Sequence, residues 1–556
     1  MIQNQEKGNL RDSILIFIKG SNLKGLIYLF FLIIFGGAEI LIDQYIGLFP
    51  SEMQTYILSS NRSKFKTSLI YFVGKVLLIS IDISIKLWLA DRLTIVYRQN
   101  IVQSIHKYYL RENAFYDILM YDIQIDNPDA RITNDVMSYA KSMSIVITGC
   151  IQIPILIIWY TILVKKYVDS NSILINYGFS LITICFTLIF MIPVIRSTYN
   201  FEKKDGDFRL AHVSVKENAE SICLSKGQSR EKMILTERLH ELLDSQIHLA
   251  NRSFFLNFFS QFFPYLGGII PYFCLYLFFK TKGTSMTPAE ISSYILEASF
   301  YIIELTYGLT SIFNIFREFS SLCGYATRIS ELWKIIEEHK KLVLDSPPSN
   351  SIELFEANIS KPNGDVLIQH LTFSVLNESL FITGPSGCGK SSIFRVLGRL
   401  WPLNEGKVLT PSPDPHTLLI LTQRPYIPVG SFKECCTFPL NVNEVDPTEL
   451  IDAISFMKLD KLLLRNPINW VEGISPGERQ RIALIRVLLH KPRFVLLDEA
   501  TSAIPMDLEA QIFEKFTQLR ITMITIAHNQ SLKRFHQNIL EIFDDGDYTI
   551  TPVNCN

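Results

Sequence analysis

Long apolar runs fill the N-terminal part of the chain, and each is long enough to cross a bilayer, which takes about 20 residues per helix. Several of these runs are apolar on all helical faces, as is typical of helices that face lipid. This pattern predicts a helical membrane domain over residues 1–340. Its six expected spans lie near 24–48, 68–90, 143–164, 173–196, 254–280 and 291–317.

The pattern changes after a stretch at 341–350 that contains Pro and Ser, which we interpret as a linker. Short apolar runs with the length of buried strands follow at Leu380–Thr383, Arg493–Leu497 and Ile521–Ile526. Polar loops separate them from amphipathic stretches. Residues 351–556 are therefore predicted to form a separate α/β domain.

Composition and charge agree with this division. The chain has 556 residues, too many for one domain, and its 48% hydrophobic content is high for a soluble protein. The net charge of −1, with acids interleaved among the bases, argues against nucleic-acid binding. Lys and Arg are frequent in the inter-span stretches 91–142 and 197–253, which favours the cytosolic side for them. The N-terminus lacks a signal-peptide pattern, so the first span is expected to direct insertion and to leave both ends in the cytosol.

Charged side chains inside the expected spans would be costly facing lipid, so they are expected to face a cavity or one another. Asp82 and Lys86 are four residues apart and are predicted either to pair on one helix face or to line the transport path. Glu297 and Glu304 are candidates for cavity residues on the last span. The complete set is Glu39, Asp43, Lys75, Asp82, Lys86, Glu297 and Glu304.

A phosphate-binding loop follows the first predicted strand of the C-terminal domain. The glycines let several backbone N–H groups point at one anion, while Lys390 reaches the β- and γ-phosphates and Ser391 ligates Mg²⁺. A helix beginning near Ser392 would place its positive N-terminus at the phosphates. The residues of this predicted ATP site are Gly384, Pro385, Ser386, Gly387, Cys388, Gly389, Lys390, Ser391 and Ser392.

Four further motifs follow in a fixed order. Gln423 comes after the loop, residues 474–481 read Ile-Ser-Pro-Gly-Glu-Arg-Gln-Arg, Asp498-Glu499 ends an apolar strand, and His528 follows the next strand. Together with the phosphate-binding loop, this order resembles the ATPase domain of ABC (ATP-binding cassette) proteins. The resemblance implies a fold with six membrane helices of the ABC exporter type, followed by a cytosolic α/β P-loop ATPase domain.

The resemblance also implies roles for these residues. Three residues are expected to be catalytic. Gln423 would sense the metal and the attacking water, Glu499 would activate that water, and His528 would contact the γ-phosphate. Asp498 would support Mg²⁺ together with Ser391 and Gln423. In ABC proteins the signature of one cassette closes on the nucleotide of another, so Ser475 and Gly477 are expected to act in trans.

Two departures from the ABC pattern affect these expectations. Pro476 replaces the first glycine of the signature, which is tolerable if Ser475 caps a helix, Pro476 is its first residue and Glu478 completes a capping box. After the Walker B strand the chain reads Ser-Ala-Ile-Pro at 502–505, so the family's interface aspartate is absent. We also find no adenine-stacking aromatic near 359–363. Together these differences are expected to weaken communication across the dimer or affinity for the base, and an impaired or strongly asymmetric ATPase stays an alternative.

Within the superfamily, residues 126–136 resemble a cytosolic loop of subfamily D half-transporters, and 212–227 resemble that subfamily's acidic motif before the fifth span. Such segments are expected to couple ATP closure to helix movement. The Ser-Pro-Gly-Glu signature, the missing aspartate and residues 527–536 are most similar to the lysosomal cobalamin branch. The Pro-Ser-Gly-Cys-Gly run is more similar to the peroxisomal branch, which carries long-chain fatty acyl-CoA.

The resemblance therefore implies an ATP hydrolase that acts as a dimer of half-transporters, with ATP and Mg²⁺ as cofactors. Expected partners are a second, identical chain, membrane lipid, a small-molecule cargo and cobalamin-handling membrane or cytosolic proteins. The expected activity moves cobalamin from the lysosomal lumen to the cytosol. Import of acyl-CoA into peroxisomes and nucleotide-dependent regulation without transport are the alternatives, and peroxisomal or endoplasmic reticulum membranes are alternative locations.

Overall fold

A computed structural model of the chain divides into two compact units, which are described separately. The first comprises Met1–Tyr108 and Ile125–Ile335, and the second comprises Tyr109–Gln124 and Ile336–Asn556. The described residues are 16, 22–111, 113–121, 128–282, 286–339, 349–361, 364–403, 405–412, 414–465, 470–471, 473–543 and 546–553. Most of the predicted linker, part of the loop at 126–136 and residues 362–363 of the adenine region lie outside them.

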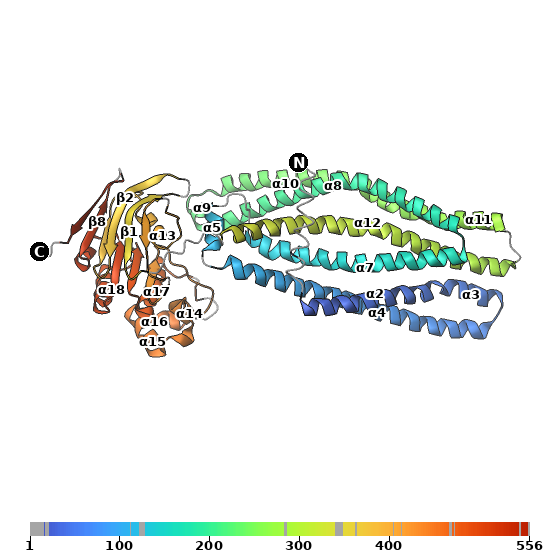
Figure 1. Ribbon diagram of the computed structural model, residues 1–556, viewed down its shortest axis with the longest axis horizontal. Helices are drawn as coiled ribbons and strands as arrows, with labels where there is room; N and C mark the ends of the chain where they lie inside the picture. Colours follow the sequence, from blue (N-terminus) through green and yellow to red (C-terminus); the bar gives the residue numbers. More distant parts are fainter. Residues whose placement is uncertain are drawn as a thin grey trace. The chain divides into compact units, whose positions relative to one another are not determined.

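Long helices lie side by side in the first unit, and α8 and α10 pack against each other along their length (Figure 1). Side-chain caps begin two of them, since Asn22 accepts from the N–H of Gly25 and Asp169 accepts from that of Ser172. The elements are α2 (Leu23–Gly47), α3 (Phe49–Leu58), α4 (Arg62–Tyr109), α6 (Pro128–Ala130), the π-helix η1 (Arg131–Asp135), α7 (Val136–Tyr167), α8 (Ser170–Glu217), α9 (Ala219–Leu224), α10 (Gln228–Gly267), α11 (Ile270–Lys282) and α12 (Pro288–His339).

Five helical segments of the described chain are long and apolar enough to cross a membrane. They are Leu23–Leu58, Arg62–Tyr109, Pro128–Tyr167, Ser170–Glu217 and Gln228–Thr281.

The sixth predicted span, 291–317, lies on α12, which is long enough but is made more polar by Glu297 and Glu304. The predicted span 254–280 is interrupted after Gly267, where α10 ends and the chain turns before α11. The limits of the six spans and of the domains stay predictions.

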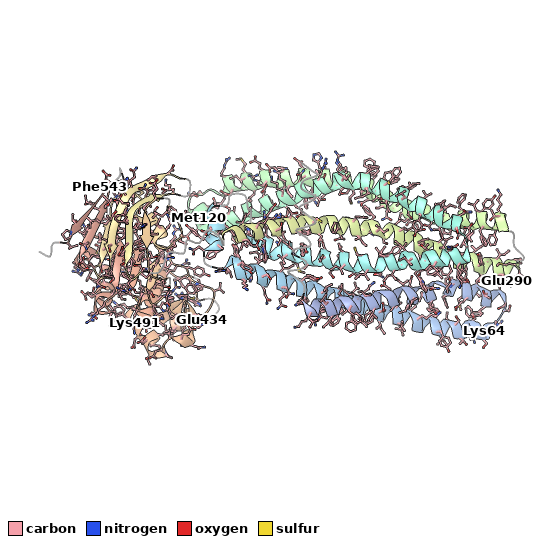
Figure 2. The ribbon with its side chains drawn as sticks, viewed as in Figure 1. Lys64, Met120, Glu290, Glu434, Lys491 and Phe543 are labelled. Atoms are coloured by element: carbon pink, nitrogen blue, oxygen red, sulfur yellow. The ribbon has the colours of Figure 1, made fainter. Side chains whose placement is uncertain are left out.

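Lys64 near the start of α4 and Glu290 near the start of α12 lie at the same end of the first unit (Figure 2). Both helices therefore begin at one end of the bundle. This is the arrangement that helices crossing a membrane in alternating directions require.

Of the two alternatives for Asp82 and Lys86, pairing with each other is wrong. The Lys86 ammonium pairs with Glu39 on α2 and donates to Gln152 Oε1 on α7 at 3.3 Å, while Gln152 Nε2 donates to Glu39 at 2.6 Å. Asp82 is 5% exposed, and its Oδ2 has no hydrogen-bond partner among the described residues. The partners of Lys86 lie on other helices, and the spacing of residues along α4 does not reveal contacts between helices.

The second unit contains two sheets with helices packed around them. Its helical elements are α5 (Ala114–Tyr121), α13 (Lys390–Leu397), α14 (Phe432–Thr437), the 3₁₀-helix η2 (Val442–Glu444), α15 (Pro447–Phe456), α16 (Asp460–Leu463), α17 (Pro476–His490), α18 (Met506–Gln518) and the 3₁₀-helix η3 (Gln530–Phe535). Its strands are β1 (Ile352–Ser360), β2 (Val366–Val375), β3 (Leu380–Thr383), β4 (Lys407–Leu409), β5 (Leu418–Leu421), β6 (Phe494–Asp498), β7 (Thr522–Ile526), β8 (Asn538–Ile542) and β9 (Tyr548–Pro552).

The larger sheet has the order β5-β6-β7-β3-β8-β9, parallel except for β9, and the smaller antiparallel sheet has the order β2-β1-β4. Successive residues of β6 enter different cores: Val495 and Leu497 pack with α17 and α18, whereas Phe494 and Leu496 pack with α13 and the smaller sheet. Burial on both faces explains why β6 reads as an unbroken apolar run.

Candidate functional site

Four loops meet at the carboxyl edge of the parallel sheet. The phosphate-binding loop follows β3, Gln423 follows β5, Glu499 follows β6 and His528 follows β7. Because β6 lies between β5 and β7, the loops after these three strands are neighbours even though they are far apart in sequence. Ligand sites of parallel α/β sheets form at this edge.

The phosphate-binding loop is shaped by glycines and leads directly into α13. Gly389 has a φ of +102° and stands immediately before the first residue of α13. A Cβ at this position would lie 3.2 Å from Leu367, in a backbone conformation that favours glycine. The Lys390 ammonium donates to the carbonyls of Gly384 at 2.8 Å and Pro385 at 2.6 Å, so it lies against the loop.

The rest of the loop lies around this lysine. Pro385, Ser386 and Gly387 are exposed, and Gly384 and Cys388 are half-buried. Ser392 is buried on α13.

Ser391 and Asp498 bring two oxygen ligands together. The Ser391 hydroxyl donates to Asp498 Oδ1 at 3.0 Å. Burial raises the pKa of Asp498, and the hydrogen bond from Ser391 opposes that effect. Hard oxygen donors of this kind suit Mg²⁺, which takes one or two protein ligands and completes its shell with phosphate and water.

Glu499 is held between the two other predicted catalytic residues. Gln423 Nε2 donates to Glu499 Oε2 at 2.7 Å, and His528 Nε2 lies 3.1 Å from Glu499 Oε1. The backbone of Glu499 is left-handed, with a φ of +48°, and its N–H donates to the carbonyl of Ile526 at 2.9 Å. Strain of this kind persists where the surroundings impose it, and it clusters at functional sites.

The signature segment forms the predicted capped helix start. The N–H of Glu478 donates to the Ser475 hydroxyl at 3.2 Å, the N–H of Ser475 donates to Glu478 at 2.8 Å, and Pro476 is the first residue of α17. The bond from the Ser475 backbone lowers the pKa of Glu478. The capping-box prediction is confirmed, and the proline costs no hydrogen bond within α17.

Within the described residues, Ser475 and Gly477 make no hydrogen bond to the phosphate-binding loop of the same chain. Instead, Gly477 packs against the segment after Walker B, where an added Cβ would lie 2.5 Å from the carbonyl oxygen of Ala503. Where the family has its interface aspartate, Pro505 stands immediately before the first residue of α18.

Sequence reasoning missed the helix α5, although it belongs to the second unit. Just before α5, Asn113 Nδ2 donates to the carbonyl of Arg399 at 2.9 Å, and on α5 the Tyr116 hydroxyl accepts from Trp401 Nε1 at 3.0 Å. Tyr116 also packs against the core under the smaller sheet. The sequence offered one signal for a segment packing here: Trp401 lies just beyond α13, and the N–H of a buried tryptophan needs a hydrogen-bond partner.

The two segments predicted as couplers contact other helices of the first unit. Arg131 is buried and donates to the carbonyl of Arg328 at 2.8 Å and to Glu331 at 2.9 Å, both on α12. Residues 208–239 of α8, α9 and α10 line an apolar groove of 460 Å³. Coupling through either segment stays a prediction.

Acidification should destabilise the second unit through His536. Its Nδ1–H donates to the Leu532 carbonyl at 2.9 Å, and its Nε2 accepts from the Thr525 hydroxyl at 2.9 Å. Burial lowers the pKa of His536 to about 4. The unfolded chain, with an ordinary histidine pKa of about 6.5, then binds a proton that the folded chain does not, so stability falls as the pH drops below 6.5. We expect a loss of about 2 kcal/mol at pH 5 relative to pH 7.5.

Thermal unfolding of the purified full chain at both pH values measures this loss. The variant His536→Phe keeps the ring contacts with Phe381 and Phe513 but has no group to protonate. Its unfolding temperature should depend less on pH than that of the unmodified chain. Equal pH dependence in the two proteins would assign the acid sensitivity to other groups.

Comparisons with known proteins agree with this geometry. Residues 14–279 match the family model "ABC transporter transmembrane region 2", and residues 368–502 match the model "ABC transporter". The bacterial structure titled "Structure of a bacterial Atm1-family ABC exporter with ATP bound" shares the fold, with a TM-score of 0.71, 18% identity and coverage of 94% of this chain and 93% of that chain.

Curated relatives extend over nearly the whole chain. The lysosomal cobalamin transporter ABCD4 of Homo sapiens is 27% identical over 91% of this chain and 90% of the relative. ATP-binding cassette sub-family D member 3 of Homo sapiens is 26% identical over 90% of this chain and 82% of the relative. A membrane domain of long apolar helices and an ATPase domain with its motif residues assembled at one sheet edge occur here in a single chain. The chain therefore belongs to the ABC transporters, as an ATP-driven half-transporter of subfamily D.

Proposed function

We propose that two copies of this chain form a homodimer in the lysosomal membrane that uses ATP to move cobalamin from the lumen to the cytosol. The observation that carries the ATPase part is the position of Glu499 between Gln423 and His528 at the sheet edge. ABC half-transporters work as dimers. Among the described residues, neither Ser475 nor Gly477 is hydrogen-bonded to the phosphate-binding loop of its own chain, which supports action in trans.

In the proposed mechanism, the N–H groups of the phosphate-binding loop and Lys390 bind the phosphates of ATP. Ser391 and Asp498, aided by Gln423, would hold Mg²⁺, which neutralises charge on the phosphates when bound. Glu499 accepts the proton of the attacking water. Hydrogen bonding from Gln423 fixes the orientation of the Glu499 carboxylate.

The remaining proposed contacts complete the site around the γ-phosphate. His528 is 65% exposed at the side chain and stands beside Glu499, so it can reach a phosphate at this edge. The signature of the partner subunit would contact the γ-phosphate from the side opposite His528. Positioning and charge neutralisation are what phosphoryl transfer requires of a protein.

Two observations support cobalamin as cargo over acyl-CoA. Lysosomal cobalamin transporters of two mammals are among the relatives that cover more than nine-tenths of this chain. Inside the expected spans, leaving out the residues at their ends, five carboxylates outnumber the two ammonium groups of Lys75 and Lys86, and Lys86 is already paired with Glu39. A path rich in carboxylates repels the phosphate groups of a CoA thioester more than a corrinoid with its amide groups. The acids concerned are Glu39, Asp43, Asp82, Glu297 and Glu304.

The decisive experiment reconstitutes the full chain in liposomes loaded with cobalamin and adds ATP outside, where it reaches outward-facing cassettes. We expect ATP-dependent release of cobalamin that stops in Glu499→Gln. In the parallel arm long-chain acyl-CoA is added outside together with ATP, because a peroxisomal importer moves its cargo from the cassette side into the lumen. Transport of acyl-CoA but not of cobalamin would favour the peroxisomal alternative. ATP hydrolysis without transport of either compound would favour a regulatory protein.

A further inference from the structure

Gln480 lies on the second turn of α17 with its side chain 3% exposed. Its Nε2 donates to the carbonyls of Gln423 and Glu499, both at 3.3 Å, and to the Ser502 hydroxyl at 3.1 Å. Its Oε1 accepts from the N–H of Ala503 at 2.8 Å. One buried amide thus joins three backbone segments that sequence separates.

These bonds fix the geometry of the hydrolytic site. A buried amide that loses its partners incurs the full cost of desolvation, so the arrangement around Gln480 resists change. Two of the partners are the carbonyls of the residues that bear the proposed catalytic side chains, Gln423 and Glu499. The Glu499 backbone is left-handed, and the bond from Gln480 to its carbonyl helps to hold that conformation in place.

The same helix carries the signature. Ser475 caps α17, and Gly477 packs on the carbonyl of Ala503, whose N–H is bound by Gln480. A shift of the α17 N-terminus is therefore transmitted along a rigid helix to Gln480. In the family pattern an aspartate at the position of Pro505 provides a connection between sites, and this chain lacks it.

We infer that Gln480 is a positioning residue that couples the signature segment of a subunit to Glu499 and Gln423 of the same subunit. Since the signature contacts nucleotide bound by the partner subunit, closure on one ATP would align the hydrolytic residues that act on the other. The inference rests on the proposed roles of Glu499, Gln423 and the signature.

The first test compares Gln480→Glu with wild type in the reconstituted full chain. The substituted carboxylate keeps the shape of the side chain and an acceptor for Ala503, but it cannot donate to the two carbonyls. We expect kcat for ATP hydrolysis to fall about tenfold to a hundredfold, as for misplaced catalytic groups. The KM for ATP should change less than twofold, and cooperativity between ATP sites should disappear.

Gln511→Glu, an exposed position on α18, is the matched control and should leave all three quantities unchanged. Unchanged kcat and cooperativity in Gln480→Glu would overturn the inference. So would a raised KM with normal kcat, because that result would place Gln480 in nucleotide binding. Gln480→Met provides a neutral replacement if the glutamate variant does not fold, with the same expected results.

Mixed dimers, purified through two different tags, test whether Gln480 acts on Glu499 of its own subunit or only supports the signature that serves the partner's ATP site. With Gln480→Glu and Glu499→Gln in the same subunit, the other subunit keeps an intact Glu499 and Gln480, and single-turnover hydrolysis should persist. With the two changes in opposite subunits, the one intact Glu499 sits beside the altered Gln480, and hydrolysis should fall.

The reverse order of these two rates would show that Gln480 acts only on the site of the partner subunit, and equal rates would show no coupling, so either result overturns the inference. The homodimer carrying Glu499→Gln in both subunits tests the underlying proposal separately. If that homodimer hydrolyses ATP at the wild-type rate, the assigned role of Glu499 fails, whatever the behaviour of Gln480.

Discussion

Replacing Glu499 with Gln should lower the rate of ATP hydrolysis by about 10²- to 10⁴-fold, the usual contribution of a general base. The amide has the shape of the carboxylate and can still bond to Gln423 and His528, which lie 2.7 Å and 3.1 Å from it. It cannot take a proton from water. Phosphate release by the reconstituted full chain measures the effect, and equilibrium binding of ATP should stay within about twofold of wild type because Lys390 and its loop are untouched.

The matched control for this variant is Glu514→Gln on the exposed face of α18, which should hydrolyse ATP at the wild-type rate. A rate within a few-fold of wild type for Glu499→Gln would exclude this side chain as the base. Loss of ATP binding would instead mean that the substitution disturbs the phosphate-binding loop. Measuring binding beside hydrolysis distinguishes these two failures.

The parts of the site that sequence predicted are those with short, local rules. The strand predicted at Leu380–Thr383 is β3, and the strand predicted to end before Asp498 is β6, because parallel strands buried on both faces read as continuous apolar runs. Each such strand ends at the same sheet edge. Motif residues placed directly after these strands are therefore brought together by the fold, as Gln423 and Glu499 are.

The parts that sequence did not predict depend on contacts between distant segments. Spacing along α4 suggested that Lys86 pairs with Asp82, but its partner is Glu39 on another helix. Apolar residues on both sides led to the prediction of one span over 254–280, although Gly267-Gly268 between Pro264 and Pro271 is a turn signal, and the chain turns there. In the sequence Gln480 is one polar residue of the signature, and only the structure shows its bonds to Gln423, Glu499, Ser502 and Ala503.

The second large effect is expected from Gly477→Ala, which should lower ATP hydrolysis about tenfold to a hundredfold, as displacements near 1 Å do in active sites. A Cβ at this position would lie 2.5 Å from the carbonyl oxygen of Ala503, closer than real contacts allow. Ala503 cannot retreat freely, because its N–H is bound by Gln480 at 2.8 Å. The N-terminus of α17 must therefore move, and with it the signature that the proposed dimer closes on nucleotide.

Gly324→Ala is the control for this change, because a Cβ there would meet no atom within 4 Å and α12 tolerates alanine well. Both variants should bind ATP normally, since neither residue touches the phosphate-binding loop in its own chain. Hydrolysis should fall in Gly477→Ala alone. A wild-type rate for Gly477→Ala would mean that the signature and the segment after Walker B separate in the working dimer. In that case the signature could move without shifting Ala503, and the close packing seen here would not constrain the hydrolytic site.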